Sequence, residues 1–446
     1  MRPLHACACA AAFLALAAAA FAAEPVLKGK DAFGDWHADR PGIVRLITPQ
    51  DLPKPAPSQS ASNGPDRTKM PKDVKLHLPP GFSAELVASG IRNPRAVRVA
   101  PNGDLFVADS RANQLRVYRL APGSARPAEE GVFATGLHQP YGIAFHPADK
   151  PQWVYVANSD SVVRFPYRDG DLKASGAPQT VVSGIPSSHH WTRDIAFSPD
   201  GKTMYLSVGS GSNVAEGIGA APKGGVERWA REKPLGYAWG DEQGRAEVRA
   251  YDPAGGGERV VATGLRNCAG MTVQPATGAL WCVVNERDQL GDDVPFEYAT
   301  TVREGAFYGW PWYYIGSNED PRHAGRRPDL KGKVTVPDVL MQAHSAPLNI
   351  AFYEGSQFPA EYKGDAFVAL HGSWNRNRRT GYKVVRLRFS DGRPTGEYED
   401  FMTGFVASDD AVWGRPVGVA VAGDGALIVT EDGSGTIWRV TWKGQP

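Results

Sequence analysis

The stretch IAFSPDGKTMYLSVG (residues 195–209) decides the fold, because an alternating apolar run is broken by a Pro-Asp-Gly turn and then resumes. Alternation with a period of two is typical of β-strands, and Pro, Asp and Gly supply the backbone angles of a tight reversal. The stretch therefore predicts two antiparallel strands joined by a turn. The same pattern recurs in residues 97–109, 143–158, 271–285, 350–370 and 419–432.

Six similar copies predict six similar sheets. Strand repeats of this length, none of which buries both faces alone, are typical of a β-propeller. We therefore expect an all-β fold, a six-bladed β-propeller of four-stranded antiparallel blades with a short N-terminal extension. The intervals before the fourth and fifth copies are the longest, which predicts inserted loops there, and loops of this kind commonly carry function.

The overall charge excludes some classes of partner. Lys and Arg number 49 and Asp and Glu 48, so no global field favours nucleic acid or an anionic membrane. No CxxCH motif for covalent haem and no Gly-rich dinucleotide motif at a strand-to-helix junction is present. Function must therefore be argued from local sites.

The N-terminus predicts export. Residues 1–22 combine an early Arg, an Ala-rich apolar run and a small-residue end, as a signal peptide does; an uncleaved membrane anchor is the alternative. We expect a periplasmic or secreted protein with no stable membrane span after signal removal. Residues 23–73 form an N-terminal extension whose Pro/Ser-rich part, from residue 49, predicts an extended tether, and the propeller occupies residues 74–446. The last strand is expected to close the ring against the first blade.

The mature chain keeps two cysteines, Cys268 and Cys282, separated by about one hairpin. In an oxidising compartment they would form a disulfide, but two buried free thiols explain the pattern equally well.

Polar residues stand at corresponding positions in three repeats, just before the expected innermost strands: His190, then Arg266 with Asn267, and finally Arg415. Ring closure would gather them at one mouth of the propeller. An imidazole there could act as a general base, and Arg donors suit a carboxylate or a developing oxyanion. A backbone-bonded loop histidine and salt bridges between blades are the structural alternatives.

Two further loops are rich in charge. VVNERDQLGDD (residues 283–293) holds Glu286, Asp288, Asp292 and Asp293, oxygen donors of the kind that Ca²⁺ prefers. Their spacing is not that of an EF-hand, and a solvated acidic loop is the alternative. The second loop, HGSWNRNRRTGYKVVRL (residues 371–387), carries several Arg residues that a solvated surface would also explain.

The motifs GLRNCAG, VVNERDQLGDD, FYGWPWYY and HGSWNRNRRTGYKVVRL, with LPPGFSAELVASGIRNPR before them, resemble the pyrroloquinoline quinone (PQQ) dependent sugar dehydrogenases. The resemblance covers nearly the whole mature chain and is strongest to the L-sorbosone dehydrogenase branch, with soluble glucose dehydrogenase as a more distant relative. It implies that PQQ lies flat at one mouth of the propeller and is held with Ca²⁺.

The resemblance also implies roles for single residues. His190 matches the catalytic base, and Arg266 and Asn267 match the pair that contacts the quinone oxygens. The carbonyls of Arg287 and Asp288 match the Ca²⁺ ligands, whereas Asp292 and Asp293, with Glu286, match acids that bind additional Ca²⁺. Arg415 matches an arginine that binds a cofactor carboxylate, and Arg376 is the candidate for a family lysine with the same task. Val417 stands where glucose dehydrogenases carry a second arginine.

The function expected from these residues is PQQ-dependent oxidation of an aldose or sugar aldehyde, with electrons passed to a separate acceptor such as a cytochrome or a quinone. Two alternatives remain open: a Ca²⁺-dependent lactonase-type propeller, whose metal lies in the channel, and a non-catalytic binding propeller. His344 and four tryptophans near the expected mouth could contact a ligand: Trp191, Trp310, Trp374 and Trp413.

Overall fold

The repeat at residues 195–209 folds as its pattern predicts. In the computed structural model, which describes residues 25–444, it forms β13 (Ile195–Phe197) and β14 (Met204–Val208), paired antiparallel with Ile195 opposite Leu206. Gly201 in the turn has a φ of +69°, a left-handed conformation that glycine adopts at little cost. The expected signal peptide, residues 1–22, lies outside the described residues.

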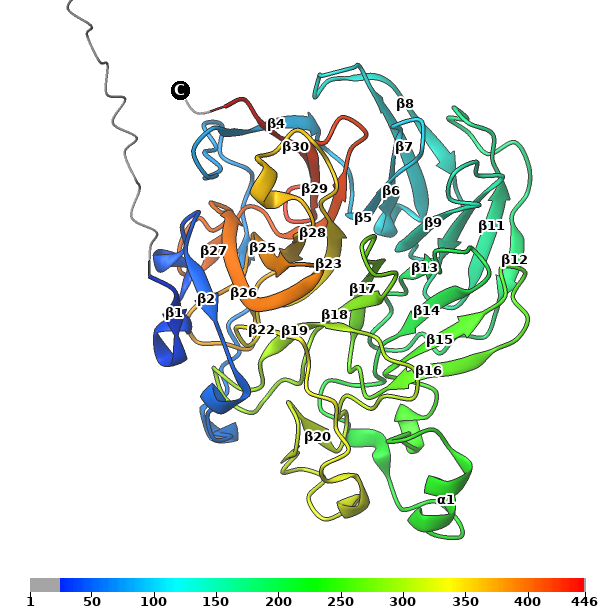
Figure 1. The fold of residues 1–446 in the computed structure, drawn as a ribbon, viewed down its shortest axis with the longest axis vertical. Coiled ribbons are helices and arrows are strands. Elements are labelled where there is room, and N and C mark those ends of the chain that lie inside the picture. Colours follow the sequence, from blue (N-terminus) through cyan, green and yellow to red (C-terminus); the bar gives the residue numbers. More distant parts are fainter. Residues whose placement is uncertain (1–24, 445–446) are drawn as a thin grey trace, which may run out of the picture.

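Six four-stranded antiparallel sheets form the blades, and successive inner strands contact one another around a ring (Figure 1). The predicted six-bladed all-β propeller is therefore confirmed. From the inner strand outward, blade one is β5 (Pro94–Val99), β6 (Leu105–Asp109), β7 (Gln114–Leu120) and β8 (Pro127–Ala134); blade two is β9 (Gly142–His146), β10 (Trp153–Ala157), β11 (Val162–Pro166) and β12 (Gln179–Val182); blade three is β13, β14, β15 (Glu247–Tyr251) and β16 (Arg259–Thr263).

The other three blades follow the same plan, and blade five has two additional strands at its outer edge. Blade four is β17 (Cys268–Val273), β18 (Leu280–Val284), β19 (Glu297–Thr301) and β22 (Val339–Met341); blade five is β23 (Pro347–Phe352), β24 (Ala366–Leu370), β25 (Lys383–Ser390) and β26 (Arg393–Met402), extended by β2 (Val44–Leu46) and β1 (Leu27–Lys28); blade six is β28 (Pro416–Val421), β29 (Leu427–Glu431), β30 (Thr436–Trp442) and β4 (Phe82–Ala88).

The second strand of each blade is buried on both faces, which explains why these strands are mostly apolar. On β10, Val154 and Val156 join the core between blades one and two, whereas Tyr155 and Ala157 join the core between blades two and three. Successive side chains of a strand point to opposite faces, so a single strand serves two neighbouring interfaces. Packing between blades is therefore the source of the hydrophobic core.

The ring is closed by a strand from the N-terminal part of the propeller, which completes blade six. β4 pairs antiparallel with β30, with Phe82 opposite Trp442. The last strand thus closes the ring as expected, but its partner is the outer strand of its own blade rather than a strand of blade one. A strand from the start of the chain and three from its end make one sheet.

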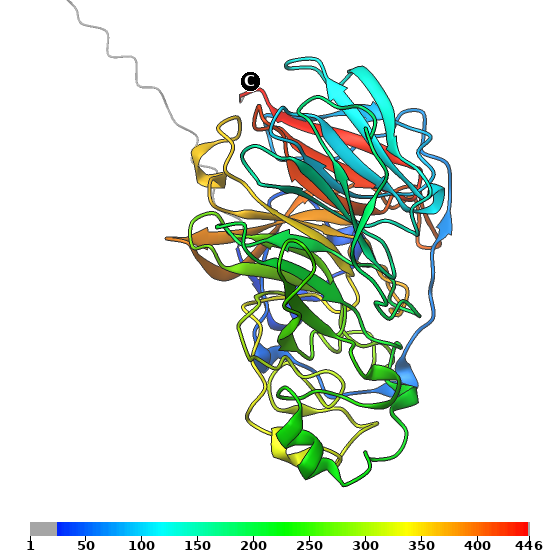
Figure 2. The same ribbon diagram turned by 90° about the vertical axis from the view of Figure 1, so that its right-hand side faces the viewer.

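The longest insertions lie in blades three and four, in the two intervals that the sequence marks as long. The first follows β14 and contains η6 (Glu216–Ile218), α1 (Val226–Glu232) and η7 (Gly240–Glu242). The second follows β19 and contains β20 (Tyr313–Tyr314), β21 (Asn318–Glu319) and η8 (Pro328–Leu330). They share an aromatic core that includes Trp239 and Trp312. Together they form a lobe that projects beyond the blades (Figure 2).

The N-terminal extension is fixed to the propeller, which differs from the expected tether. β2 pairs with β26, and four buried charged side chains join the extension to blade five: Asp39, Arg45, Lys383 and Asp400, called the ionic cluster below. Farther along, β3 (Asp66–Arg67) pairs in parallel with β27 (Ala411–Val412), and the Asn63 amide donates to the Trp374 carbonyl (2.6 Å). The Pro/Ser-rich stretch is extended, but its backbone groups are bonded to propeller loops.

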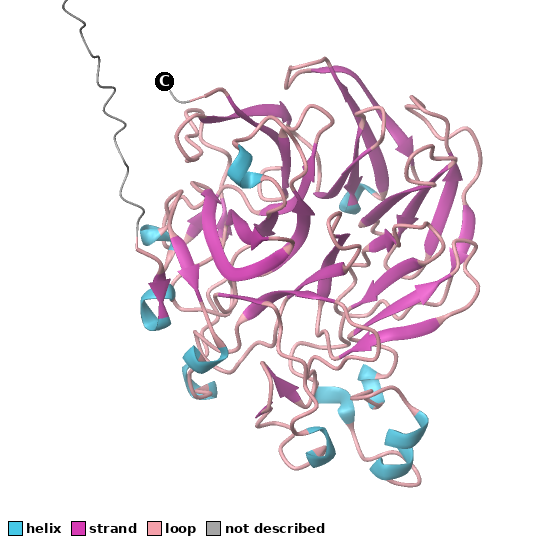
Figure 3. Ribbon diagram, viewed as in Figure 1, coloured by secondary structure: helices cyan, strands magenta, loops and turns pink. Residues whose placement is uncertain are grey.

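The remaining helices are single 3-10 turns outside the blade strands (Figure 3): η1 (Gly29–Ala32), η2 (Trp36–Ala38), η3 (Pro49–Asp51), η4 (Pro57–Gln59), η5 (Ser110–Ala112) and η9 (Ala360–Tyr362). Within residues 25–444, no helix has the length and apolar character needed to cross a membrane. Cys268 and Cys282, whose state the sequence leaves open, form a disulfide between β17 and β18.

Candidate functional site

The candidate site lies at one end of the ring, called the mouth, where the inner strands begin. Because each second strand runs antiparallel to its inner strand, residues that precede the first and follow the second meet at this end. His190 precedes β13 and Arg415 precedes β28. Arg266 and Asn267 directly precede β17. The sequence-predicted residues of three blades thus gather at the same end of the propeller.

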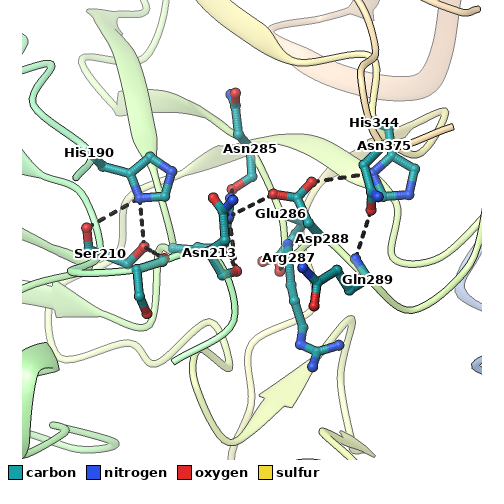
Figure 4. Close-up of polar contacts among 12 residues, drawn as sticks. His190, Ser210, Asn213, Asn285, Glu286, Arg287, Asp288, Gln289, His344 and Asn375 are labelled. Atoms are coloured by element: carbon teal, nitrogen blue, oxygen red, sulfur yellow. Dashed lines mark hydrogen bonds and ion pairs between the residues drawn. The ribbon is translucent and has the colours of Figure 1, made fainter. Parts of the chain in front are cut away.

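His190 is partly exposed, and its hydrogen bonds define its tautomer. Nδ1 lies 2.8 Å from Ser210 Oγ and 3.2 Å from the Ser210 carbonyl oxygen, as Figure 4 shows. Ser210 Oγ donates its own hydrogen to the Ser212 carbonyl (2.8 Å), so Nδ1 must carry the proton that joins these groups. Nε2 is left without a hydrogen and makes no hydrogen bond within the described chain. The ring therefore presents a free base.

The charge state of His190 agrees with that role. Burial, and next to it the positive charge of Arg266, hold the pKa of His190 well below 6.5. The imidazole is therefore neutral at pH 7 and can accept a proton.

Two buried arginines hold the loop that carries His190. Arg245 donates to the carbonyls of Gly209 (2.6 Å), Ser188 (2.7 Å), Ser210 (2.7 Å) and His190 (3.3 Å). Arg193 donates to the carbonyls of His190, Thr192 and Pro186. These two residues, called the loop clamp below, make no ion pair with a described carboxylate. They fix both the backbone of His190 and the backbone of its hydrogen-bond acceptor.

Arg266 and Asn267 lie beside this base. Arg266 is buried, donates to the carbonyls of Asn213 and Asn285, and pairs with Asp288 at 3.3 Å. Its guanidinium also lies over the Trp310 ring, 5.3 Å from the centroid. Asn267 is close to His190, because a Cβ added to Gly209 would meet both. The buried side-chain oxygen of Asn267 has no hydrogen-bond partner, so the pair leaves a polar group for a ligand.

The acidic loop after β18 divides into two parts. Glu286, Arg287 and Asp288 are buried at the mouth, whereas Asp292 accepts from the Asn377 amide and Asp293 pairs with Arg376 (2.9 Å). Among residues 25–444, no group of three or more His, Cys, Asp or Glu side chains is placed to hold a metal. The side-chain acids that the resemblance assigns to additional Ca²⁺ are therefore not gathered into such a group.

The backbone of the same loop does fit a cation. The carbonyls of Arg287 and Asp288 belong to buried residues, and neither accepts a hydrogen bond within the described chain. Buried carbonyls normally have a partner, and peptide oxygens are ligands that Ca²⁺ prefers. Burial also raises the pKa of Glu286 to about 7 and raises the pKa of Glu297, beneath the loop, well above its usual value.

Arg415 lies across the mouth with open donors. Its Nε donates weakly to the His371 carbonyl (3.4 Å), and its terminal nitrogens have no hydrogen bond or ion pair in the described chain. Burial lowers the pKa of Arg415, as expected for a guanidinium without a bonded acid. An anionic group of a ligand would find two free NH₂ groups there.

Arg376, the second predicted carboxylate binder, is already occupied. It is buried and donates to the carbonyls of Arg378 and Phe33 as well as to Asp293. Of its nitrogens only Nε lacks a partner. The structure thus ties Arg376 to the N-terminal extension and the acidic loop.

Sequence reasoning missed a second polar group at the mouth, centred on Asp432. This carboxylate accepts from Arg95 (2.7 Å), Asn93 (3.1 Å) and His371 (2.8 Å), which come from blades one and five. The Arg95 guanidinium also lies 5.5 Å from the Trp191 ring centroid, next to His190. The available signal was the phrase IRNPR, which repeats the Arg-Asn pair of LRNCA at the same strand position.

The other aromatic and histidine candidates have different environments. Trp413 is buried against Phe405, and Trp310 packs on Arg266 while donating to Glu242. His344 is buried and lies 2.9 Å from the Gly291 carbonyl, which it bonds through Nε2. Trp374 is 39% exposed and is the most exposed of the four predicted tryptophans.

The fold and this mouth define the class of protein: a six-bladed propeller that gathers a neutral histidine, a buried Arg-Asn pair and open arginine donors at one end. The chain belongs to the TrAA12-like family, whose model matches residues 76–295 and 327–443. This membership agrees with the family resemblance read from the sequence motifs.

Named relatives point the same way. The chain is 24% identical to a pyrroloquinoline quinone-dependent pyranose dehydrogenase of Coprinopsis cinerea, over 82% of this chain and 54% of that protein. It is 23% identical to a pyrroloquinoline quinone-dependent sugar dehydrogenase of Hypocrea jecorina, over 80% of this chain and 87% of the other. The chain spans about half the length of the first curated relatives that it matches.

Solved structures share the fold. The holo PQQ domain of the pyranose dehydrogenase from Coprinopsis cinerea superposes with a TM-score of 0.68 at 23% identity, covering 83% of this chain and 98% of that domain. At this identity the likeness establishes the architecture.

Proposed function

We propose that this protein is a PQQ- and Ca²⁺-dependent dehydrogenase that oxidises an aldose or a sugar aldehyde of the glucose or sorbosone kind. The observation that carries the proposal is His190, a neutral imidazole whose Nδ1–H is bound by Ser210 and whose Nε2 is free, set beside the buried Arg266–Asn267 pair. Oxidation of an alcohol carbon needs a base placed to take the hydroxyl proton, and this geometry provides one.

The residues around the mouth fit the cofactor. The partnerless carbonyls of Arg287 and Asp288 would hold Ca²⁺, the side-chain N–H groups of Asn267 and Arg266 would donate to the quinone oxygens, and Arg415 would bind a cofactor carboxylate. When bound, the Ca²⁺-held quinone supplies the acceptor for the hydride that leaves the substrate carbon. Val417 leaves the rim of the site with one arginine fewer than glucose dehydrogenases have.

The chain's own residues then perform the proton chemistry. His190 Nε2 takes the proton of the substrate hydroxyl, and Ser210 holds the ring in the tautomer that leaves Nε2 unprotonated. The loop clamp keeps base and acceptor in one geometry, which saves the cost of ordering them during the reaction. Electrons leave to a separate acceptor, because the chain has no covalent haem motif.

The lactonase alternative finds less support. Such an enzyme needs acidic side chains from several blades around one metal, and residues 25–444 contain no group of three or more His, Cys, Asp or Glu side chains placed for it. The signal-like residues 1–22 support a periplasmic or secreted location, where the expected mature protein consists of the extension up to residue 73 and the propeller from residue 74.

Reconstitution tests the proposal. PQQ and Ca²⁺ are added to the purified protein, and quinone absorbance and dye reduction are recorded with a panel of aldoses and sugar aldehydes. We expect tight binding and turnover, and His190→Ala should reduce turnover by about 10²- to 10⁴-fold. His146→Gln, at the opposite end of an inner strand, is the matched control and should retain activity. Absence of PQQ binding at micromolar concentration would refute the proposal.

A further inference from the structure

A cavity of about 670 Å³ lies beside the mouth, and the proposed chemistry does not use it. Its walls come from four separate segments: the N-terminal extension, the acidic loop, the lobe and the loop after β24. The residues that matter most for its chemistry are Ser60, Ser62, Arg287, Gln289, Trp374 and Asn375. The extension therefore builds one wall of a cavity at the functional end of the propeller.

Hydrogen bonds between the walls fix the shape of this cavity. The Gln289 amide donates to Asn375 Oδ1 (2.7 Å), Asn375 Nδ2 donates to the Ala61 carbonyl, and the Asn63 amide donates to the Trp374 carbonyl (2.6 Å). Ser60 Oγ accepts from the Gly291 amide (3.0 Å). Trp374 is thus held by its backbone while 39% of the residue remains exposed.

A second observation points to a polar ligand. Arg287 lines the cavity and is 4% exposed, yet its Nη1 has no hydrogen-bond partner. The charge of Arg287 is paired with Asp320, at 2.7 Å from Nε. A buried N–H without an acceptor is costly, so the Arg287 guanidinium is a donor group at the cavity wall that its own chain does not fully satisfy.

The cavity and the mouth share one loop. On one side of residues 285–289, the Asn285 carbonyl accepts from Arg266 (3.1 Å), and on the other side Gln289 bonds Asn375. Figure 4 shows His190 on one flank of this loop and Asn375 on the other. A molecule long enough to pass the loop would occupy both sites.

We infer that this cavity binds a further sugar ring of a neutral oligosaccharide whose terminal ring is oxidised at the mouth. The partly exposed Trp374 would pack against the C–H face of a pyranose, while the serine hydroxyls, the Gln289 side chain and the Arg287 guanidinium would meet its hydroxyls. The inference rests on the proposed dehydrogenase function and narrows its substrate class to saccharides of two or more rings.

Chain-length preference tests the inference. For the reconstituted protein, kcat/KM is measured with maltotriose, cellotriose and xylotriose and with the matching monosaccharides. We expect a preference of about tenfold or more for at least one trisaccharide, equivalent to one good aromatic contact with its hydrogen bonds. Trp374→Ala should abolish that preference and Trp374→Phe should restore part of it. Trp153→Ala, a partly exposed tryptophan of blade two, is the control and should keep the preference.

Calorimetric titration of the same trisaccharides gives a readout besides turnover. Binding that Trp374→Ala weakens supports the inference even if no sugar is oxidised, in which case the dehydrogenase proposal alone fails. Turnover of monosaccharides without any preference for trisaccharides overturns the inference and leaves the dehydrogenase proposal intact. Equal trisaccharide binding by the wild type and Trp374→Ala also overturns it.

Discussion

Two groups of buried cationic side chains in this propeller differ in their partners: one group is paired with carboxylates and the other is not. The ionic cluster sets Arg45 and Lys383 against Asp39 and Asp400, with contacts of 2.6 to 3.0 Å, so charge is balanced. The loop clamp, Arg193 and Arg245, is equally enclosed but bonds only backbone carbonyls and one serine hydroxyl. The first group joins two segments of chain, whereas the second orders a loop.

The difference shows how burial of charge relates to function. A balanced cluster satisfies its members internally and leaves nothing for a ligand. Burial, and after it the positive charges of Arg266 and Arg245, lower the pKa of His190 and keep the imidazole neutral, and unbalanced cations at the mouth also favour an anionic cofactor. We therefore expect substitutions in the ionic cluster to change stability and substitutions in the loop clamp to change catalysis.

The largest expected effect breaks the balanced group. Asp400→Asn leaves two buried cations facing a single carboxylate, and we expect the free energy of unfolding in urea to fall by about 3 to 5 kcal/mol. Glu304→Gln, in the exposed pair with Arg259, is the control and should cost less than about 1 kcal/mol. A loss of similar size in both variants would show that the ionic cluster is not special.

Arg245→Ala should reduce kcat by about 10- to 100-fold, because a base displaced by a fraction of an ångström loses its alignment. Arg245→Lys should recover part of the loss by keeping the charge and some of the carbonyl contacts. The acid limb of the pH profile should move upward in the alanine variant, since the Arg245 charge contributes to the lowered pKa of His190. If Arg245→Ala changed stability but left kcat unchanged, the positioning role would be contradicted. Arg259→Ala, in the same blade, is the control and should leave kcat unchanged.

Arg415 and Arg376 provide a comparison within the mouth and its surroundings. Arg415→Ala should raise the Kd for PQQ about tenfold or more, because it removes free donors to an anionic group. Arg376→Ala should raise it less than about threefold, since Asp293 and two carbonyls already occupy that side chain. Titration of PQQ in the presence of Ca²⁺ measures both. Equal losses would restore Arg376 as a cofactor ligand, the role implied by the family resemblance.

The smallest effect concerns the wild-type pH profile. A histidine with a lowered pKa stays neutral, and therefore active as a base, until the pH falls below that value. The acid limb of kcat/KM, which reports groups of the free protein, should lie below pH 6.5. A limb at or above pH 6.5 would mean that neither burial nor the neighbouring positive charges lower the pKa of His190.

Local patterns in the sequence were enough to predict the blade architecture and the positions of His190, Arg266 and Arg415. Each repeat contains its own turn, and each of these residues stands next to its inner strand, so no distant contact is needed to place it. Arg95 and Asp432 escaped notice because their association depends on ring closure, which brings together residues 337 positions apart. The roles assigned to the site residues stay predictions.

Residues that act through the backbone were the hardest to predict. Arg245 lies in an insertion, and nothing in its neighbourhood indicates that its partners are the carbonyls of Ser188, Gly209 and Ser210. The Pro/Ser-rich stretch reads as a tether by composition, but hydrogen bonds to loops hundreds of residues away fix it in place. For the same reason the resemblance could not show that Arg376 faces the extension.

The pairing of β4 with β30 has a consequence for biosynthesis. β4 is made before the inner strands of the other five blades, whereas its partner, residues 436–442, is the last blade strand in the sequence. Throughout synthesis the growing chain carries an unpaired edge strand, a template for wrong association. Blade six therefore completes only once residues 436–442 have been made, and removal of these residues would leave the ring open.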